Sequence, residues 1–251
     1  MHASQYALIE SLEDHYWWHH GLRERLLAEI RRAFPGAHRL RILDAGCGPG
    51  GNLRALSRSF PEAETHGLDI SPLAVEAARR KQSPGVVLAP VEQMPFPDEL
   101  FDIVVSTDVI DQSCVDPSRA VAEFARVLRP GGTLIMNLPA FECLQGTHGT
   151  AMESVRRFTR RSLQDLISGP FQIVRMRYWN AALFPALYLW RAISRRASAR
   201  SEVRSDLRPL PAWLNATLAA YLSAESRLAG LVPMPFGSSL MVSATRRGTP
   251  A

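Results

Sequence analysis

A glycine-rich turn holds the residue types with the clearest chemistry in this chain. After a short apolar segment the sequence reads Asp44-Ala45-Gly46-Cys47-Gly48-Pro49-Gly50. Glycines let a backbone turn tightly and approach a ligand that would clash with a Cβ atom. The helix that follows offers unpaired N–H groups, and the carboxylate of Asp44 can accept hydrogen bonds from an ammonium group. These features predict a nucleotide-like ligand at the end of the first strand.

A second acidic residue, Asp69, lies 19 residues after Gly50, at the end of the next apolar segment. A carboxylate in that place can accept hydrogen bonds from two ribose hydroxyls. The alternative is that Asp69 only caps the next helix, but Ser71 is better placed for the cap. The glycine spacing, GxGxG, is also tighter than the GxGxxG of dinucleotide enzymes. A ribose-binding carboxylate is therefore favoured.

Strands and helices must alternate to bring these two turns together, and the sequence predicts that they do. Apolar residues at helical spacing predict a helix over residues 6–34, which Pro35 and Gly36 end. Strands are expected at residues 41–44, 66–70, 86–88, 101–106 and 133–138. Helices are expected at residues 53–60, 72–82 and 117–128. Strands separated by helices imply right-handed crossovers and a parallel sheet.

The pattern is looser beyond Pro139. A helix is expected at residues 160–167, a strand at 171–178, further helices at 181–197 and 211–230, and a final strand at 238–244. Residues 198–211 are rich in arginine, serine and proline. Such a composition is typical of a loop, and we expect this stretch to be mobile.

The charge of the chain is unevenly distributed. The 251 residues carry a net charge of +5, yet residues 1–150 hold 14 basic and 19 acidic side chains. Residues 151–251 hold 15 arginines and only 5 acidic side chains. The second part is expected either to face an anionic substrate or a membrane surface, or to be a solvated basic face. Aromatic residues are not interleaved with these arginines, which argues against nucleic acid as a partner.

Cysteine usage and apolar runs restrict the class of protein further. Cys47, Cys114 and Cys143 form neither a CxxC pair nor a zinc-type cluster, so neither a disulfide framework nor a metal site is predicted. The first ten residues lack the pattern of a signal peptide. The longest apolar run, residues 181–190, is shorter than the roughly 20 residues that a membrane-spanning helix needs. We therefore expect a cytoplasmic protein.

Together the motifs resemble those of the class I, Rossmann-like S-adenosylmethionine-dependent methyltransferases, in the group with a type 11 methyltransferase domain. The resemblance covers residues 40–140 and rests on five segments in the family's order. They are residues 43–50, Gly67-Leu68-Asp69-Ile70-Ser71-Pro72, Met94-Pro95-Phe96-Pro97-Asp98, Phe101-Asp102-Ile103-Val104-Val105-Ser106 and Arg126-Val127-Leu128-Arg129-Pro130-Gly131-Gly132.

The resemblance implies an α/β fold with seven strands in the order 3-2-1-4-5-7-6. Strand 7 would be antiparallel, and helices would cover both faces of the sheet. The implied parts are an N-terminal helical lid (residues 1–38), a Rossmann-like core that binds the cofactor (39–178), a helical substrate cap (179–235), and a final strand and tail (236–251). The apolar part of the cap is expected to be aromatic and to consist of Tyr178, Trp179, Phe184, Tyr188, Trp190 and Trp213.

The resemblance also implies S-adenosylmethionine as the cofactor and S-adenosylhomocysteine as its product. The methionine part would lie near Asp44, Gly46, Cys47, Gly48, Gly50, Ser106 and Asp108. Asp69 would hold the ribose, and the adenine would lie beside Ile70, Val91 and Glu92.

The aromatic stretch Asp14-His15-Tyr16-Trp17-Trp18-His19-His20 is similar to a segment that some relatives fold over the cofactor. Trp17 is then expected to contact the cofactor. The alternative for this stretch is a helix that simply packs on the sheet. Two adjacent tryptophans and three histidines are costly to bury without partners, which favours the lid.

Three departures from the family's pattern concern recognition and catalysis. Pro90 stands where many relatives have an acidic residue for the adenine amino group, so that contact would fall to the backbone of Val91 or to Glu92. Gln112 stands where relatives have a histidine that can act as a general base. Gly149 and Ser154 replace polar groups on the substrate side. The acceptor site is therefore expected to differ from that of the relatives.

Methyl transfer needs alignment of the acceptor more than strong acid or base catalysis, because the cofactor already carries the activation. Where a base is required, the candidates are His19, His20, His148 and Asp111. Tyr16 can shield the reaction from water and stabilise a positive sulfonium through its ring.

Three functions remain open at this point. The first is methyl transfer to a small molecule, amphiphilic or a natural product. The second is a repurposed methyltransferase fold that binds the cofactor but catalyses a cyclisation, elimination or rearrangement. The third is a module without catalytic activity that binds membranes through the basic C-terminal part. The sequence makes no prediction about oligomeric state.

Overall fold

The computed structural model describes residues 3–36, 39–81, 85–145, 153–197, 209–228 and 234–248. Its centre is one seven-stranded sheet in the order β3-β2-β1-β4-β5-β7-β6. The strands β1 to β5 pair in parallel, and β7 runs antiparallel to both β5 and β6. This order and the antiparallel β7 confirm the fold predicted from the sequence. The strands are β1 (Arg41–Ala45), β2 (Glu64–Asp69), β3 (Val86–Leu88), β4 (Phe101–Thr107), β5 (Leu128–Pro139), β6 (Phe171–Trp179) and β7 (Ser239–Arg246).

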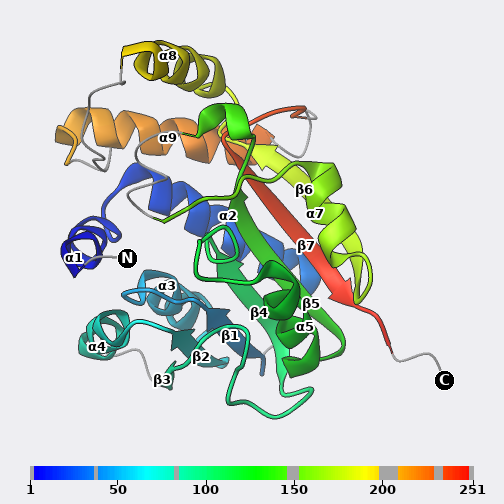
Figure 1. Ribbon diagram of the computed structural model, residues 1–251. Helices are drawn as coiled ribbons and strands as arrows, with labels where there is room; N and C mark the ends of the chain where they lie inside the picture. Colours follow the sequence, from blue (N-terminus) through cyan, green and yellow to red (C-terminus); the bar gives the residue numbers. More distant parts are fainter. Residues whose placement is uncertain are drawn as a thin grey trace.

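Helices cover both faces of this sheet (Figure 1). Helices α4 (Pro72–Arg80), α5 (Pro117–Val127) and α7 (Arg160–Ile167) begin after a residue whose side chain caps them. Ser71 accepts from the backbone N–H of Ala74 and Pro72 follows it, whereas the carboxylate of Asp116 accepts from the next two backbone N–H groups. The others are α1 (Ala3–Leu12), α2 (Trp17–Ala33), α3 (Gly51–Ser59), the short 3₁₀ helix η1 (Glu142–Leu144), α8 (Phe184–Ala197) and α9 (Ala212–Leu228).

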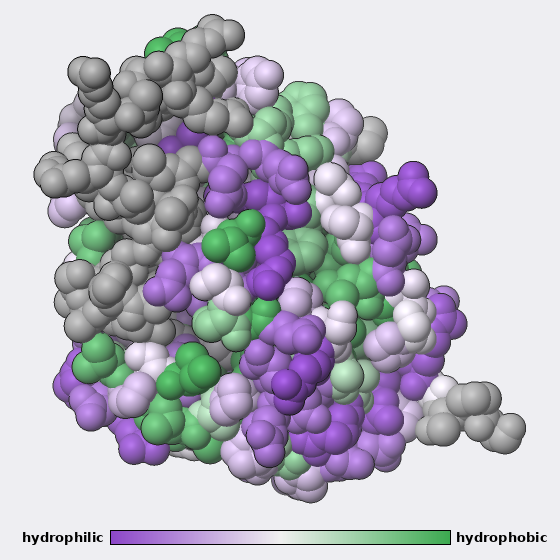
Figure 2. Space-filling model, in the orientation of Figure 1, coloured by the Kyte–Doolittle hydropathy of each residue, from purple (hydrophilic) through white to green (hydrophobic). Residues whose placement is uncertain are grey.

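The core consists of apolar layers on the two sides of the sheet. On one side, Leu26 and Ile30 of α2 pack with Ile42 of β1 and with Leu56 of α3. On the other side, α5 and α7 bury their apolar faces against alternate residues of the same strands. Because both faces are covered, β1 and β4 are buried along almost their whole length. Hydrophilic residues predominate over the lower right part of the face in Figure 2.

The N-terminal segment differs from the sequence prediction. Residues 6–34 were expected to form one helix, but α1 ends at Leu12 and α2 begins at Trp17. The break is stabilised by tertiary contacts, because the side chain of Glu13 accepts from the backbone N–H of Gly51, 3.1 Å away. Helix α2 also contributes to the core beneath the sheet. The buried residues of α2 begin at Gly21, so the predicted lid can include only residues that precede Gly21.

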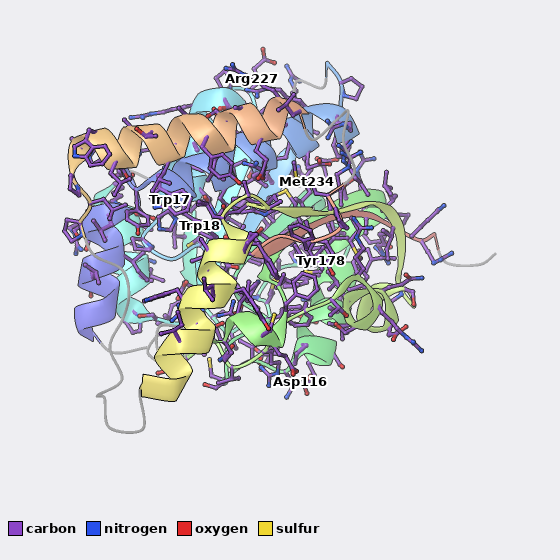
Figure 3. All side chains as sticks on the ribbon, turned by 90° about the horizontal axis from the view of Figure 1, so that it is seen from above. Trp17, Trp18, Asp116, Tyr178, Arg227 and Met234 are labelled. Carbon is purple, nitrogen blue, oxygen red and sulfur yellow. The ribbon has the colours of Figure 1, made fainter. Side chains whose placement is uncertain are left out.

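Helices α8 and α9 lie above the edge at which the parallel strands end, at the top of Figure 1. In the view from above, Trp17 and Trp18 lie between α9 and α8 (Figure 3). The backbone N–H of Trp17 donates to Asn215 of α9 (2.9 Å), and the ring of Trp18 stacks on Trp179 with centroids 5.7 Å apart. Among the described residues, no helix is both long enough and apolar enough to cross a membrane.

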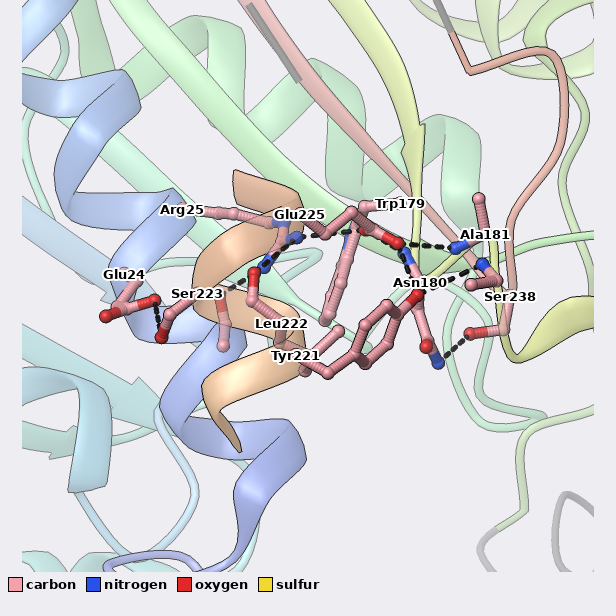
Figure 4. Close-up of polar contacts among 12 residues, drawn as sticks. Glu24, Arg25, Trp179, Asn180, Ala181, Tyr221, Leu222, Ser223, Glu225 and Ser238 are labelled. Carbon is pink, nitrogen blue, oxygen red and sulfur yellow. Dashed lines mark hydrogen bonds and ion pairs between the residues drawn. The ribbon is translucent and has the colours of Figure 1, made fainter. Parts of the chain in front are cut away.

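A buried polar network fastens α9 to the rest of the fold (Figure 4). Glu225 of α9 pairs with Arg25 of α2 at 3.0 Å, and both side chains are almost fully buried. The same carboxylate accepts from the backbone N–H groups of Asn180 (2.6 Å) and Ala181 (2.8 Å), just after β6. One side chain of α9 therefore joins α2 to the end of β6.

We expect the replacement Glu225→Ala to destabilise the protein by about 3–5 kcal/mol, because it leaves the charge of Arg25 buried without its partner. Equilibrium unfolding in urea measures this change. The matched control is Ser223→Ala on the same helix, which removes only a hydrogen bond to Glu24 and should cost about 1 kcal/mol. Equal losses for the two variants would contradict the importance of the ion pair.

Candidate functional site

A cavity of about 490 Å³ opens at the carboxyl ends of the parallel strands. Ligands of open α/β sheets bind at this edge, and the volume lies in the range of small-molecule sites. The cavity wall is formed by residues from the α1–α2 turn and the start of α2, the glycine-rich turn, the ends of β2 and β4, the loops that follow β3 and β4, the segment after β5, and α8.

The glycine-rich turn forms the floor of the cavity. The N–H groups of Gly46 and Cys47 donate to the carbonyl oxygen of Leu68, at 2.7 and 2.9 Å, and so tie the turn to the end of β2. Gly46 has a φ of +83°, and a Cβ atom there would lie 2.3 Å from Val109 Cγ2. No other residue type fits this position without moving Val109 in the loop after β4. Space remains open above Gly48, where a Cβ would meet nothing within 4 Å.

Asp69 lies beside this turn at the end of β2. Its Oδ2 accepts from the N–H of Gly48 at 2.9 Å and its Oδ1 from the N–H of Ser71 at 2.8 Å. Burial raises the pKa of Asp69, whereas these hydrogen bonds lower it, and burial has the larger effect. The next residue, Ile70, lines the cavity with an exposed fraction of 56%. A carboxylate held in place beside an open apolar surface is suited to a ribose with an attached base.

Asp44 is the most unusual group at this edge. The side chain is fully buried, and neither carboxylate oxygen has a hydrogen-bond partner among the described residues. Burial, together with the charges of Asp69 and Glu13, raises the pKa of Asp44 to about 8. A buried carboxylate without a partner is costly, and a cation beside it would offset that cost. The site therefore suits a ligand with an ammonium group.

The turn between α1 and α2 forms a second wall. Tyr16, Trp17 and His19 line the cavity from this side. The carboxylate of Glu13 reaches the N-terminus of α3 and also contacts Lys81, while Asp14 pairs with Arg54 of α3. These contacts attach the aromatic segment directly to the helix that begins at the glycine-rich turn.

The loop after β4 forms the opposite end of the cavity. Asp108 adopts a left-handed conformation with φ of 55°, and its carboxylate accepts from Asn137 Nδ2 at 3.2 Å. Asp111 is 1% exposed, and its Oδ1 has no partner among the described residues. Burial raises the pKa of both carboxyl groups, and the charge of Asp111 adds to the effect on Asp108. The Ser154 side chain hydrogen-bonds to Asp111.

Twelve of the residues predicted for the site line this cavity. The glycine-rich turn and the ends of β2 and β4 contribute most of them, and the aromatic segment and the loop after β3 contribute the others. They are Tyr16, Trp17, His19, Gly46, Cys47, Gly48, Asp69, Ile70, Val91, Glu92, Asp108 and Asp111.

Five predicted residues lie elsewhere. Asp44 and Gly50 lie next to the lining, and Ser106 is buried within β4, so that the lining on this strand begins only at Thr107. His20 is exposed outside the cavity wall. His148 lies outside the described residues. Burial lowers the pKa of the remaining histidine candidate, His19, to about 3, and the charge of Arg23 adds to this effect.

Most of the aromatic residues predicted for the substrate cap do not line the cavity. Of the six aromatic residues expected there, only Trp190 lines the cavity. Tyr178 and Trp179 are buried, because Tyr178 stacks on Phe141 and Trp179 donates to Asn137 at 2.8 Å. Trp213 points away and is 70% exposed. The apolar wall on this side consists instead of Leu144, Leu183, Leu187 and Trp190.

Sequence reasoning assigned no role to Asn52, which lines the cavity. Asn52 donates to Thr107 Oγ1 at 3.1 Å and so connects the first turn of α3 to the end of β4. The position of Asn52 directly after Gly51 was a signal for this role. Arg157 and Arg191 also line the cavity. No local pattern distinguishes these two from the many other arginines of the C-terminal part.

A seven-stranded sheet with an antiparallel seventh strand and a glycine-rich turn after the first strand defines the class I, Rossmann-like methyltransferase fold. Residues 43–136 match the family model described as a methyltransferase domain. The sheet order and this match together show the Rossmann-like methyltransferase fold. Its structure is similar to that of geranyl diphosphate methyltransferase in complex with SAM, with a TM-score of 0.62 at 16% identity, over 91% of this chain and 85% of that one.

Two curated relatives show how far the sequence similarity extends. An uncharacterized protein in a transposon of Streptomyces fradiae is 30% identical over 77% of this chain and 58% of its own length. A malonyl-[acyl-carrier protein] O-methyltransferase of Enterobacter lignolyticus is 36% identical over 52% of this chain and 51% of its own length. The chain therefore spans about half the length of these relatives.

We expect Asp44→Asn to stabilise the ligand-free protein at pH 8, because the variant removes a buried charge without a partner. The folded-state pKa of Asp44 is about 8, above its ordinary value of 3.8. The stability that the proton supplies is therefore lost progressively as the pH rises from 3.8 to about 8, and it falls no further above that pH. Thermal unfolding of the wild type and the variant from pH 6 to 9 measures this difference.

The melting temperature of Asp44→Asn should exceed that of the wild type by at least about 2 °C at pH 8, and the gap should shrink toward pH 6. Asp98→Asn is a suitable control, because Asp98 is exposed. If the melting temperatures of the wild type and of Asp44→Asn change equally with pH, the claim that Asp44 is a buried carboxylate without a partner is wrong.

Proposed function

We propose that this protein transfers a methyl group from S-adenosylmethionine to a small-molecule acceptor. The observation that carries this proposal is the carboxylate of Asp44, buried without a partner beside Asp69 and the glycine-rich turn. Asp44 lies behind the lining, so an ammonium group beside the glycine-rich turn would offset its charge there, while a ribose on the same molecule would contact Asp69. The cavity continues past this end to Asp111 and α8, which leaves room for a second molecule.

The residues at the floor of the cavity would hold the cofactor. Asp44 would offset the charge of its ammonium group, Asp69 would accept from the ribose hydroxyls, and Ile70 and Val91 would contact the adenine. The carboxylate of Glu92 already accepts from the backbone N–H of Asp116 at 2.9 Å. Glu92 would therefore form part of the wall beside the adenine. When bound, the cofactor supplies a methyl group on a positively charged sulfur, so the chain itself needs to supply alignment.

The aromatic segment would exclude water from this end. Tyr16 and Trp17 lie in the wall with their rings tilted toward each other, at a centroid distance of 6.0 Å. Aromatic faces also stabilise a nearby positive charge. We propose that residues Glu13 to His19 form the lid, and that the contacts of Glu13 with α3 hold it in the closed position.

Asp111 is the strongest candidate for a general base. Its raised pKa makes it a better proton acceptor than an ordinary carboxylate, and its Oδ1 faces no partner among the described residues. His19 is a weaker candidate, because a pKa of about 3 leaves its ring a poor base. Asp111 would accept the proton of an acceptor hydroxyl, amine or activated carbon while the neighbouring Asp108 stays bound to Asn137.

The direct test is to incubate the protein with S-adenosylmethionine and a panel of small acceptors, and to follow S-adenosylhomocysteine by mass spectrometry. We expect acceptor-dependent formation of S-adenosylhomocysteine together with a methylated product. Consumption of an acceptor without S-adenosylhomocysteine would overturn methyl transfer and favour the repurposed reaction. Failure to bind either cofactor form in calorimetry would overturn the cofactor assignment itself.

With an acceptor identified in this way, Asp111→Asn should lower kcat by about 100-fold or more, as expected for loss of a general base. The affinity for S-adenosylhomocysteine should stay within about twofold, since Asp111 lies at the acceptor end. Asp165→Asn, an exposed carboxylate of α7, is the matched control. An undiminished kcat in Asp111→Asn would show that alignment alone suffices.

A related variant tests the cofactor end. Asp44→Asn should weaken the binding of S-adenosylhomocysteine by about 10- to 100-fold, the loss expected for a charged hydrogen bond of about 1.5–3 kcal/mol. Calorimetry measures this affinity without any acceptor. Unchanged binding in Asp44→Asn would contradict the ammonium contact.

A further inference from the structure

We propose that Arg157 and Arg191 bind an anionic group, a carboxylate or a phosphate, on an otherwise apolar acceptor. The structure thereby assigns amphiphilic anions as the substrate class. This inference rests on the proposed function, because it concerns the acceptor end of the same cavity. It goes beyond that function in naming the residues that select the acceptor.

Two cationic side chains from distant parts of the sequence meet at this end of the cavity. Arg157 comes from the segment that follows η1, and Arg191 comes from α8, yet both line the same wall. The two charges are close enough to affect each other. Burial lowers the pKa of Arg157, the charges of Asp111 and Asp108 act against this effect, and the charge of Arg191 adds to it. An anion that lies between two cationic side chains is attracted by both of them.

Both guanidinium groups are held in defined positions. Arg157 Nε donates to Gln145 Oε1 at 2.8 Å, which fixes the plane of the group. The guanidinium of Arg191 lies over the ring of Trp190, with its carbon 4.5 Å from the ring centroid. A fixed planar guanidinium presents a fork of N–H donors that matches a carboxylate or a phosphate.

Acidic side chains also lie near this end of the cavity. Arg157 interacts electrostatically with Asp108, Asp111 and Arg191, and Arg156 lies next to it with its guanidinium donating to the carbonyl oxygen of Gln112. Burial raises the pKa of both aspartates, and the charge of Asp111 opposes ionisation of Asp108.

One face of α8 carries the complementary apolar surface. Leu183, Leu187 and Arg191 follow one another at a spacing of four residues, so they lie along the same side of the helix. All three line the cavity, and Leu144 of η1 adds to the apolar part. Along this side of the helix the side chains change from leucine to arginine over roughly 12 Å, at 1.5 Å per residue. An acceptor with an apolar body and one anionic group matches this order.

The test uses four probes with the same twelve-carbon chain: laurate, dodecyl phosphate, dodecanol and dodecyltrimethylammonium. Each is titrated below its aggregation limit into the full chain with saturating S-adenosylhomocysteine, and tryptophan fluorescence follows binding without turnover. We expect one or both anions to bind at least about 10-fold more tightly than the alcohol, since hydrogen bonds to charged groups contribute about 1.5–3 kcal/mol. The cationic probe should bind most weakly. The stronger of the two anions identifies the group as a carboxylate or a phosphate.

The variants Arg157→Gln and Arg191→Gln should each reduce the affinity for the preferred anion by about 10-fold or more and leave that for dodecanol within about twofold. Arg161→Gln is the matched control, because it removes the same charge from an exposed position on α7. If Arg157→Gln does not fold, as judged by its thermal transition, Arg191→Gln decides the question alone.

Three results would overturn the proposal: no binding of either anion, equal binding of the anions and the alcohol, or an equal loss in Arg161→Gln. Each of these can occur while S-adenosylhomocysteine still binds, which leaves the proposed function intact. Failure of the wild type to bind S-adenosylhomocysteine is the separate result that would refute the proposed function.

Discussion

The structure depends on a concentration of buried carboxylates at one edge of a parallel sheet. Asp44 and Asp69 end neighbouring strands, and the N-terminal segment brings Glu13 to the same place, so that these charges oppose one another's ionisation. Asp69 and Glu13 are offset by backbone N–H groups of the glycine-rich turn and of α3, and Glu13 also by Lys81. Asp44 alone has no partner among the described residues. The fold thus retains one buried carboxyl group whose ionisation is unfavourable without a ligand, and a cation on a ligand would make it favourable.

Two glutamates hold the walls of the cavity against the sheet. Glu13 fastens the α1–α2 turn to the start of α3, and Glu225 fastens α9 to α2 and to the residues after β6. Each joins segments that are far apart in the sequence by accepting from backbone N–H groups in a buried place, where a hydrogen bond that is left unmade is costly. Because the network of Glu225 also orients Trp179, which donates to Asn137 and through it supports Asp108, a change in α9 can reach the acceptor end of the cavity.

The alternation of strands and helices and the turns at the floor of the cavity could be predicted from local signals, whereas the strand order 3-2-1-4-5-7-6 was implied by the resemblance to the class I methyltransferases. A glycine-rich turn after an apolar strand, a strand-end aspartate and Ser71-Pro72 at a helix start each encode their own geometry. The break at Glu13 could not be predicted, since the helical pattern continues through it and only the contact with Gly51 ends α1. The prediction of an aromatic cap was wrong because long-range contacts also decide this part of the structure. Aromatic residues of the C-terminal part divide between core, surface and cavity, and long-range packing alone decides which of them, such as Trp190 or Trp213, faces the ligand.

The distribution of charge inside the cavity explains why the basic C-terminal part and the acidic N-terminal part belong to one site. Carboxyl groups of Asp44 and Asp69 lie at one end, and Arg157 and Arg191 lie at the other together with Asp108 and Asp111. The pKa of Asp111 is raised by burial and lowered in part by the neighbouring arginines. Under the proposed function, a cationic cofactor would be attracted to the first end and an anionic acceptor to the second, so the field of the protein would help to orient the two ligands. Such an orientation is what a transfer reaction between them requires, because it fixes which groups meet at the centre.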